Sequence, residues 1–173
     1  MIKMNEFLPD PLRPFILQIQ NEEIRKSVMK SLKRVWNLFI KCPGSLSHHH
    51  KGDGGLLRHT IEVCEIGLNI IESLDLKVNR DYYIASALLH DIGKCWEYAK
   101  DPVTGEWYKA KTLGDHEVTF IVSLASNGNT PLPREILYAI LGHMGGWSNT
   151  SVFPDSLLAA VLSSADLISS RLE

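Results

Sequence analysis

The residues in this sequence best suited to chemistry are a histidine and an aspartate that stand side by side, His90 and Asp91. An imidazole and a carboxylate together suit borderline divalent cations such as Mn, Fe, Co, Ni or Zn. Lys94 follows about one helical turn later, where an ammonium can contact a phosphate oxygen. Gly93 is expected to leave the backbone open to close approach. Alone, such a pair is more often structural than metal-binding, so its meaning depends on the rest of the chain.

Other residues of metal-binding type are spread along the chain, separated by apolar segments. Asp166 lies in the apolar stripe of the last expected helix, where burial of an unpaired carboxylate is costly. A metal ion or a metal-bound histidine would offset that cost. Ligands on separate rigid helices fix a coordination geometry better than loop residues do. These further candidates are His59 before the pair, and His116, His143 and Asp166 after it.

The segments that carry these residues have apolar side chains at spacings of three and four, which predicts amphipathic helices. One helix is expected after Asn21, one from Gly55 that carries His59, and one through Tyr82 with His90 and Asp91 in its C-terminal part. Three more are expected, one opening around His116, one running to His143, and one from about Pro154 that carries Asp166. Aromatic segments on both sides of the turn 101–105 predict a β-hairpin, whose aromatic residues either cover the core or stack on a base.

We therefore expect an all-α fold, a bundle of five to seven helices with one small β-hairpin. It would form one structural domain, with residues 1–42 as an N-terminal helical segment packed on a core formed by residues 43–173. The 173 residues suffice for one sizeable core. The net charge of −2 gives no global attraction to nucleic acid, so such a substrate would be short or held locally.

The three cysteines are odd in number and widely spaced, which is typical of free thiols in a reducing compartment. No signal peptide is visible, and no apolar run approaches the roughly 20 residues that span a bilayer. The sequence thus predicts a cytoplasmic protein without a membrane partner, and it sets no oligomeric state.

The order His, His-Asp, His, His, Asp resembles that of the HD metal-dependent phosphohydrolase superfamily, in particular its two-metal members. The resemblance covers roughly residues 43–170. The segment 47–60, SHHHKGDGGLLRHT, is similar to the entry motif of the HD regions in 3′-5′ exoribonucleases and in the HD relaxases of conjugative elements.

The resemblance implies two divalent ions (Mn, Fe, Ni, Co, Zn or Mg) and a phosphate-bearing substrate, a nucleotide or short nucleic acid. It implies that Asp91 bridges the ions and that Lys94 steadies negative charge on the substrate, as the two catalytic residues. Met144 stands where two-metal relatives often have a second histidine, so the second site is expected to have fewer ligands. By the resemblance, one ion is held by His59, His90, Asp91 and Asp166, the other by Asp91, His116 and His143, while His48, His49, His50 and Lys94 bind the substrate.

Three functions remain open at this point. The favoured one is a phosphodiesterase acting on short single-stranded nucleic acid or a small nucleotide by two-metal activation of water. The others are a single-metal nucleotide phosphomonoesterase, against which His116 and His143 argue, and a non-catalytic HD interaction module, against which the complete ligand set argues. A cyclic-dinucleotide phosphodiesterase also remains open, although the Gly-Tyr-Pro segment of that branch is missing after His116.

Overall fold

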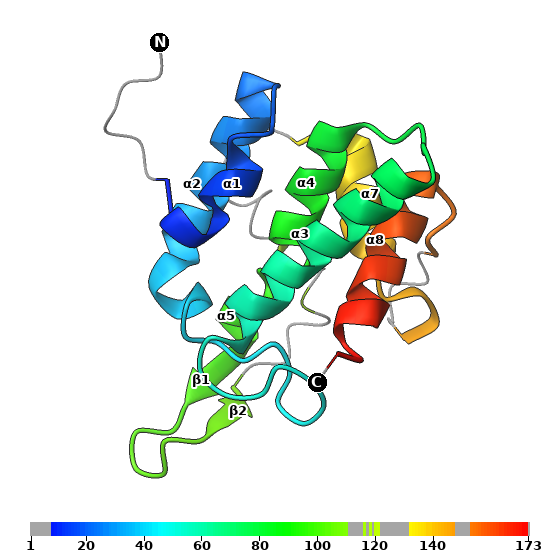
Figure 1. The fold of residues 1–173 in the computed structure, drawn as a ribbon. Helices are drawn as coiled ribbons and strands as arrows, with labels where there is room; N and C mark the ends of the chain where they lie inside the picture. The colour runs from blue at the N-terminus through cyan, green and yellow to red at the C-terminus, as the bar shows by residue number, and fades with distance from the viewer. Residues whose placement is uncertain are drawn as a thin grey trace.

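A computed structural model of the chain describes residues 8–110, 116, 118, 120, 121, 132–147 and 153–172. Within them the chain is mainly helical with one two-stranded sheet, which confirms the expected fold class (Figure 1). The helices are α1 (Arg13–Ile16), α2 (Glu22–Phe39), α3 (Gly55–Ser73), α4 (Arg80–Leu89), α5 (Lys94–Glu97), α7 (Arg134–Gly142) and α8 (Leu157–Ser169). Short 3-10 turns are η1 (Asp10–Leu12) and η2 (Gly145–Trp147), and the strands are β1 (Tyr98–Lys100) and β2 (Trp107–Lys109).

Two asparagines begin the helices that the sequence indicated. The Asn21 side-chain oxygen accepts hydrogen bonds from the first backbone N–H groups of α2, and Asn79 does the same for α4. The Asp81 carboxylate in the first turn of α4 also accepts from the backbone N–H groups of Gln20 and Asn21, at 2.9 and 2.7 Å. The start of α2 is therefore tied to the start of α4.

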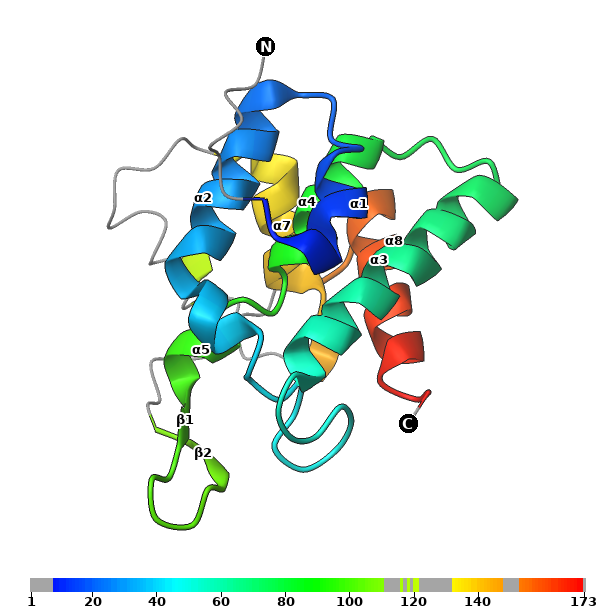
Figure 2. The same cartoon turned by 60° about the vertical axis from the view of Figure 1, so that its left-hand side comes forward.

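Helices α3, α4, α7 and α8 pack against one another, and α2 covers α4 from the outside (Figures 1 and 2). Between α3 and α4 the contact is close: a Cβ at Gly67 would lie 1.8 Å from the Tyr83 hydroxyl, which donates to the Val63 carbonyl at 2.6 Å. Only glycine lets the two helices approach this far. The division into residues 1–42 and 43–173 stays a prediction.

Strands β1 and β2 form the expected antiparallel hairpin, which extends from α5 at one end of the bundle (Figure 2). Asp53 in the loop before α3 accepts hydrogen bonds from the Trp107 indole N–H at 2.7 Å and from Lys100 at 2.7 and 2.8 Å. Trp107 and Tyr98 pack against the core, whereas Tyr108 is exposed. Packing thus accounts for two of the hairpin aromatics.

Some helix ends differ from expectation. Helix α4 ends at Leu89, so His90 and Asp91 follow the helix instead of lying within its last turn. Helix α8 begins at Leu157, after Pro154, because the Ser156 hydroxyl caps it by accepting from the Ala159 N–H. Among the described residues, no helix combines the length and apolar character needed to cross a membrane.

Candidate metal centre

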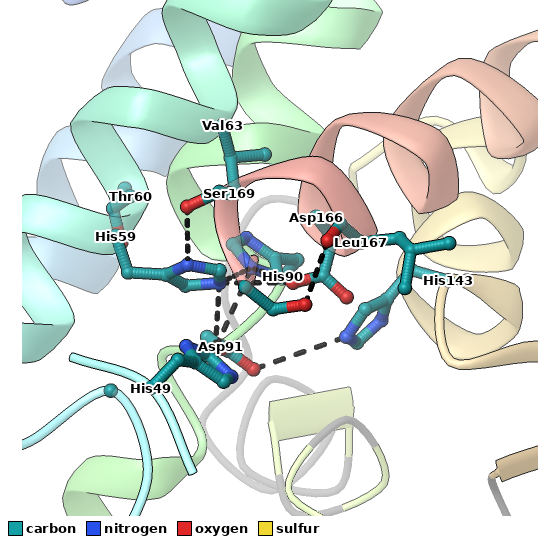
Figure 3. Close-up of polar contacts among 12 residues, drawn as sticks. His49, His59, Thr60, Val63, His90, Asp91, His143, Asp166, Leu167 and Ser169 are labelled. Carbon is teal, nitrogen blue, oxygen red and sulfur yellow. Dashed lines mark hydrogen bonds and ion pairs between the residues drawn. The ribbon is translucent and has the colours of Figure 1, made fainter. Parts of the chain in front are cut away.

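The centre is formed where several helices begin or end. His59 lies in the first turns of α3, and His90 and Asp91 directly follow α4. His143 directly follows α7, and Asp166 projects from α8. Figure 3 shows these side chains converging between α3, α8 and the end of α7. The rings of His59, His90 and His143 and the Asp91 carboxylate are buried.

Three ligand atoms in the first cluster have the spacing that a bound cation requires. His59 Nε2 lies 3.3 Å from His90 Nε2, and the two nitrogens lie 3.5 and 3.6 Å from Asp91 Oδ2. A point about 2.0 Å from all three atoms exists within this triangle, which is the usual length of a Zn–N bond. Asp166 Oδ1 adds a fourth ligand atom, 3.0 Å from His59 Nε2 and 3.9 Å from His90 Nε2.

Backbone carbonyls fix which nitrogen of two rings faces the centre. His90 Nδ1 lies 2.8 Å from the Ala87 carbonyl, and His143 Nδ1 lies 2.6 Å from the Ile140 carbonyl. A carbonyl oxygen only accepts, so each Nδ1 donates and each Nε2 keeps its lone pair. The buried His143 Nε2 has no hydrogen-bond partner among the residues that the structure describes. An unpaired buried acceptor is costly, and a cation would satisfy it.

The second cluster uses the other oxygen of Asp91. Asp91 Oδ1 lies 2.7 Å from His116 Nε2 and 3.9 Å from His143 Nε2. One carboxylate thus has an oxygen in each cluster. The expectation that Gly93 leaves the backbone open was wrong, because the chain itself fills that space: a Cβ at Gly93 would lie 1.8 Å from the His116 carbonyl oxygen.

The protonation states favour cation binding. Burial lowers the pKa of His90 to about 3, and burial also lowers the pKa of His143. Burial alone would raise the pKa of Asp91, but Lys94, His90 and His116 together outweigh it and hold that pKa well below its usual value. Burial would likewise raise the pKa of Asp166, but the neighbouring histidines His59, His143 and His90 together lower it. Neutral imidazoles and ionised carboxylates are the forms that bind metals.

Lys94 is buried, and its ammonium already has protein partners. Lys94 Nζ donates to Asp91 Oδ2 at 2.5 Å and to the Gly44 carbonyl at 2.6 Å. Burial opposes the charge, but Asp91 outweighs it and raises the pKa of Lys94. The lysine therefore balances the charge of Asp91, and its expected contact with a phosphate stays a prediction.

The three loop histidines differ in their surroundings. His48 is exposed, whereas His50 is buried and bonds to Glu62 at 3.0 Å. His49 is half-buried, and its ring centre lies 5.0 Å from that of His59 (Figure 3). Burial, together with the neighbouring His59, lowers the pKa of His49 to about 4. The His50 ring centre lies 5.1 Å from that of His59, so His49 and His50 both adjoin the first cluster.

Two polar residues around His59 were missed from the sequence. The Ser169 hydroxyl lies 2.9 Å from His59 Nδ1 and donates to Glu62 at 2.8 Å. A usable signal existed, because Glu62 is three residues after His59 and Ser169 is three residues after Asp166. Residues three apart on a helix share a face.

A helical bundle whose helix ends gather histidines and carboxylates into adjoining clusters has the donor atoms to hold divalent metal ions. The family model described as HD domain matches residues 56–171. The chain therefore belongs to the HD domain family, as the resemblance predicted. No solved structure gives a significant match to this chain.

The chain is similar to several HD proteins of known activity. It is 34% identical to the dihydroneopterin 2′,3′-cyclic phosphate phosphodiesterase of Methanocaldococcus jannaschii, over 90% of this chain and 66% of that protein. It is 28% identical to the 3′-5′ exoribonuclease YhaM of Shouchella clausii, over 73% of this chain and 38% of that protein. The chain thus spans under two thirds of the length of these relatives. Both names state hydrolysis of a phosphodiester, the class of reaction expected here.

Proposed function

We propose that this chain is a metal-dependent phosphodiesterase that hydrolyses a small phosphodiester, with two divalent ions bound at the centre. The observation that carries the proposal is the position of Asp91. One of its oxygens lies with His59 and His90, and the other lies with His116 and His143. A carboxylate in this position suits a bridge between two ions. One relative is named a phosphodiesterase and another a 3′-5′ exoribonuclease, which supports the proposal.

In this proposal the first ion is held by His59, His90, Asp91 and Asp166, and the second by Asp91, His116 and His143. Two ions at such a centre supply a water of lowered pKa and balance the charge of the phosphoryl group. The protein's residues orient the ligands: the Ala87 and Ile140 carbonyls hold the imidazoles in the metal-binding tautomer. The ligand set suits Mn, Fe, Co, Ni or Zn.

The favoured substrate is a cyclic phosphate of a nucleoside-like compound. The M. jannaschii relative is named for a substrate of this kind, a 2′,3′-cyclic phosphate. The net charge of −2 also disfavours tracking along a polymer. Three buried free cysteines suit a reducing compartment, and we propose the cytoplasm.

Metal content and turnover, measured together on wild type and His116→Ala, test the two-ion centre. The variant should keep about one ion per chain and hydrolyse a phosphodiester slower by orders of magnitude, because one side of the clamp on the phosphoryl group is lost. Glu65→Ala, at an exposed position on α3, is the control and should match wild type. Equal stoichiometry and equal turnover in His116→Ala would refute the second site and favour a single-metal enzyme.

A substrate series separates the remaining alternatives. We expect turnover of a 2′,3′-cyclic mononucleotide to exceed that of a single-stranded oligonucleotide and of p-nitrophenyl phosphate, a monoester. Preference for the oligonucleotide would place the chain with the exoribonucleases in activity. Preference for the monoester would support a phosphomonoesterase. Absence of all three activities in a chain with two bound ions would support a non-catalytic interaction module.

A further inference from the structure

A partly buried chain of hydrogen bonds adjoins the first cluster and is centred on Glu62. One oxygen of this carboxylate, Oε2, receives two partners: the Ser169 hydroxyl at 2.8 Å and His50 Nε2 at 3.0 Å. Each partner connects onward to a histidine, Ser169 to His59 Nδ1 at 2.9 Å and His50 Nδ1 to His49 Nδ1 at 3.0 Å. The loop before α3, α3 itself and α8 therefore meet at one carboxylate.

The direction of each hydrogen bond follows from the chemistry of the groups. An ionised carboxylate only accepts. Partial burial would raise the pKa of Glu62, but the hydrogen bonds from Ser169 and His50 outweigh it and keep the group ionised. The Ser169 hydroxyl has a single proton and gives it to Glu62. Its oxygen must then accept from His59, so His59 carries its proton on Nδ1 and keeps its lone pair on Nε2, the atom in the ligand cluster.

The same reasoning applies to the other arm. His50 can bond to Glu62 only by donating from Nε2, and for a neutral His50 this leaves the lone pair on Nδ1. His49 Nδ1, 3.0 Å away, must therefore donate to it. The lone pair of His49 then lies on its Nε2, in a ring 5.0 Å from the His59 ring.

We propose that Glu62 is a positioning residue that sets the tautomers of two histidines at once. It fixes His59 with Nε2 as metal ligand, and it fixes His49 with Nε2 as a hydrogen-bond acceptor beside the centre. His49 is then suited to accept from the hydroxyl group of a substrate or from a water. This inference rests on the proposed metal site. It also assigns roles to two of the three loop histidines: His49 faces the substrate, and His50 connects His49 to Glu62.

The tautomers can be read directly by nitrogen-15 NMR on the zinc-loaded chain at pH 8, because long-range proton–nitrogen correlations distinguish a protonated ring nitrogen from one with a lone pair. In wild type we expect Nδ1–H for both His49 and His59. In Glu62→Ala we expect His49 to show a mixture of tautomers and the zinc dissociation constant to rise tenfold to a hundredfold, as when other partners of metal-bound histidines are removed. The control is Glu65→Ala, at an exposed position on the same helix. It should leave the His49 tautomer and the zinc dissociation constant unchanged.

Wild-type His49 protonated on Nε2 would overturn the proposal. So would a folded Glu62→Ala protein with wild-type tautomers and wild-type zinc affinity. If the alanine variant does not fold, the wild-type spectrum decides by itself. None of these readouts requires turnover, so a chain that binds zinc with the expected tautomers but hydrolyses no phosphodiester would refute the proposed function and leave this inference standing.

Discussion

Asp91 and Lys94 form a buried ion pair, and each depends on the other for its charge. Lys94 is 8% exposed and Asp91 3% exposed, with Nζ and Oδ2 2.5 Å apart. Removing one partner of a buried pair leaves an uncompensated charge, which is far more costly than losing an exposed pair. The lysine therefore contributes to folding before any substrate is present.

Lys94→Met tests this dependence, because it keeps the apolar stem and removes the ammonium. We expect the free energy of unfolding of the metal-free protein to fall by roughly 3–5 kcal/mol, measured by urea denaturation. Lys51→Met, at an exposed position, should change it little. A loss below about 1 kcal/mol, the range of surface pairs, would show that Asp91 is balanced by other groups.

His90 makes stability depend on pH in a defined window. Its pKa is about 3 in the folded chain, because of burial, against an ordinary value near 6.5 when unfolded. Below pH 6.5 the unfolded chain binds a proton that the folded chain does not, so stability is complete above 6.5 and falls as the pH drops toward 3. Metal-free protein should lose about 1.4 kcal/mol per pH unit through His90. Urea denaturation at pH 5 and pH 6 measures this change in the free energy of unfolding. The change should be smaller in His90→Gln and equal to wild type in His48→Gln.

At the scale of elements, the sequence predicted the helices well and their ends less well. Spacing of apolar residues and the caps at Asn21 and Asn79 are local signals, and both caps are present. The order of histidines and carboxylates correctly indicated residues that meet. The Glu62 connections were missed because His50 and Ser169 reach Glu62 from segments 12 and 107 residues away in sequence. The spacing of three places Glu62 and Ser169 on the same helix faces as His59 and Asp166, but it does not show that they meet.

The contact between Gly93 and the backbone of His116 gives an element-scale prediction. Gly93→Ala would place a methyl group 1.8 Å from the His116 carbonyl, so the segment that carries His116 must move. We expect the metal content to fall from about two ions to about one while the first cluster persists. Gly146→Ala is the control, because a Cβ there meets no atom within 4 Å. Two retained ions in Gly93→Ala would show that the segment shifts without losing its ligand.

At the scale of the whole molecule, the centre joins parts of the chain that are far apart in sequence. His59, Asp91, His143 and Asp166 come from four different segments. A ligand that binds only the native state stabilises it by about 2.7 kcal/mol at a hundred times its dissociation constant. Chelator treatment should therefore lower the melting temperature, measured by calorimetry, by several degrees. Added metal should restore it. An unchanged melting temperature after verified removal of the ions would contradict this.

Because Asp91 serves both clusters, the two ions would not load independently. Two unit charges 4 Å apart interact by about 4 kcal/mol at an effective dielectric of 20, so two dications repel by roughly four times as much. The opposing effect is small: the first ion already orders the Asp91 side chain, which spares the second ion an entropy cost of only about 1 kcal/mol or less. Repulsion dominates, so binding is anticooperative, and linkage makes this effect equal in both directions. An incompletely loaded preparation would then consist mainly of molecules with one ion each, not of a mixture of full and empty ones.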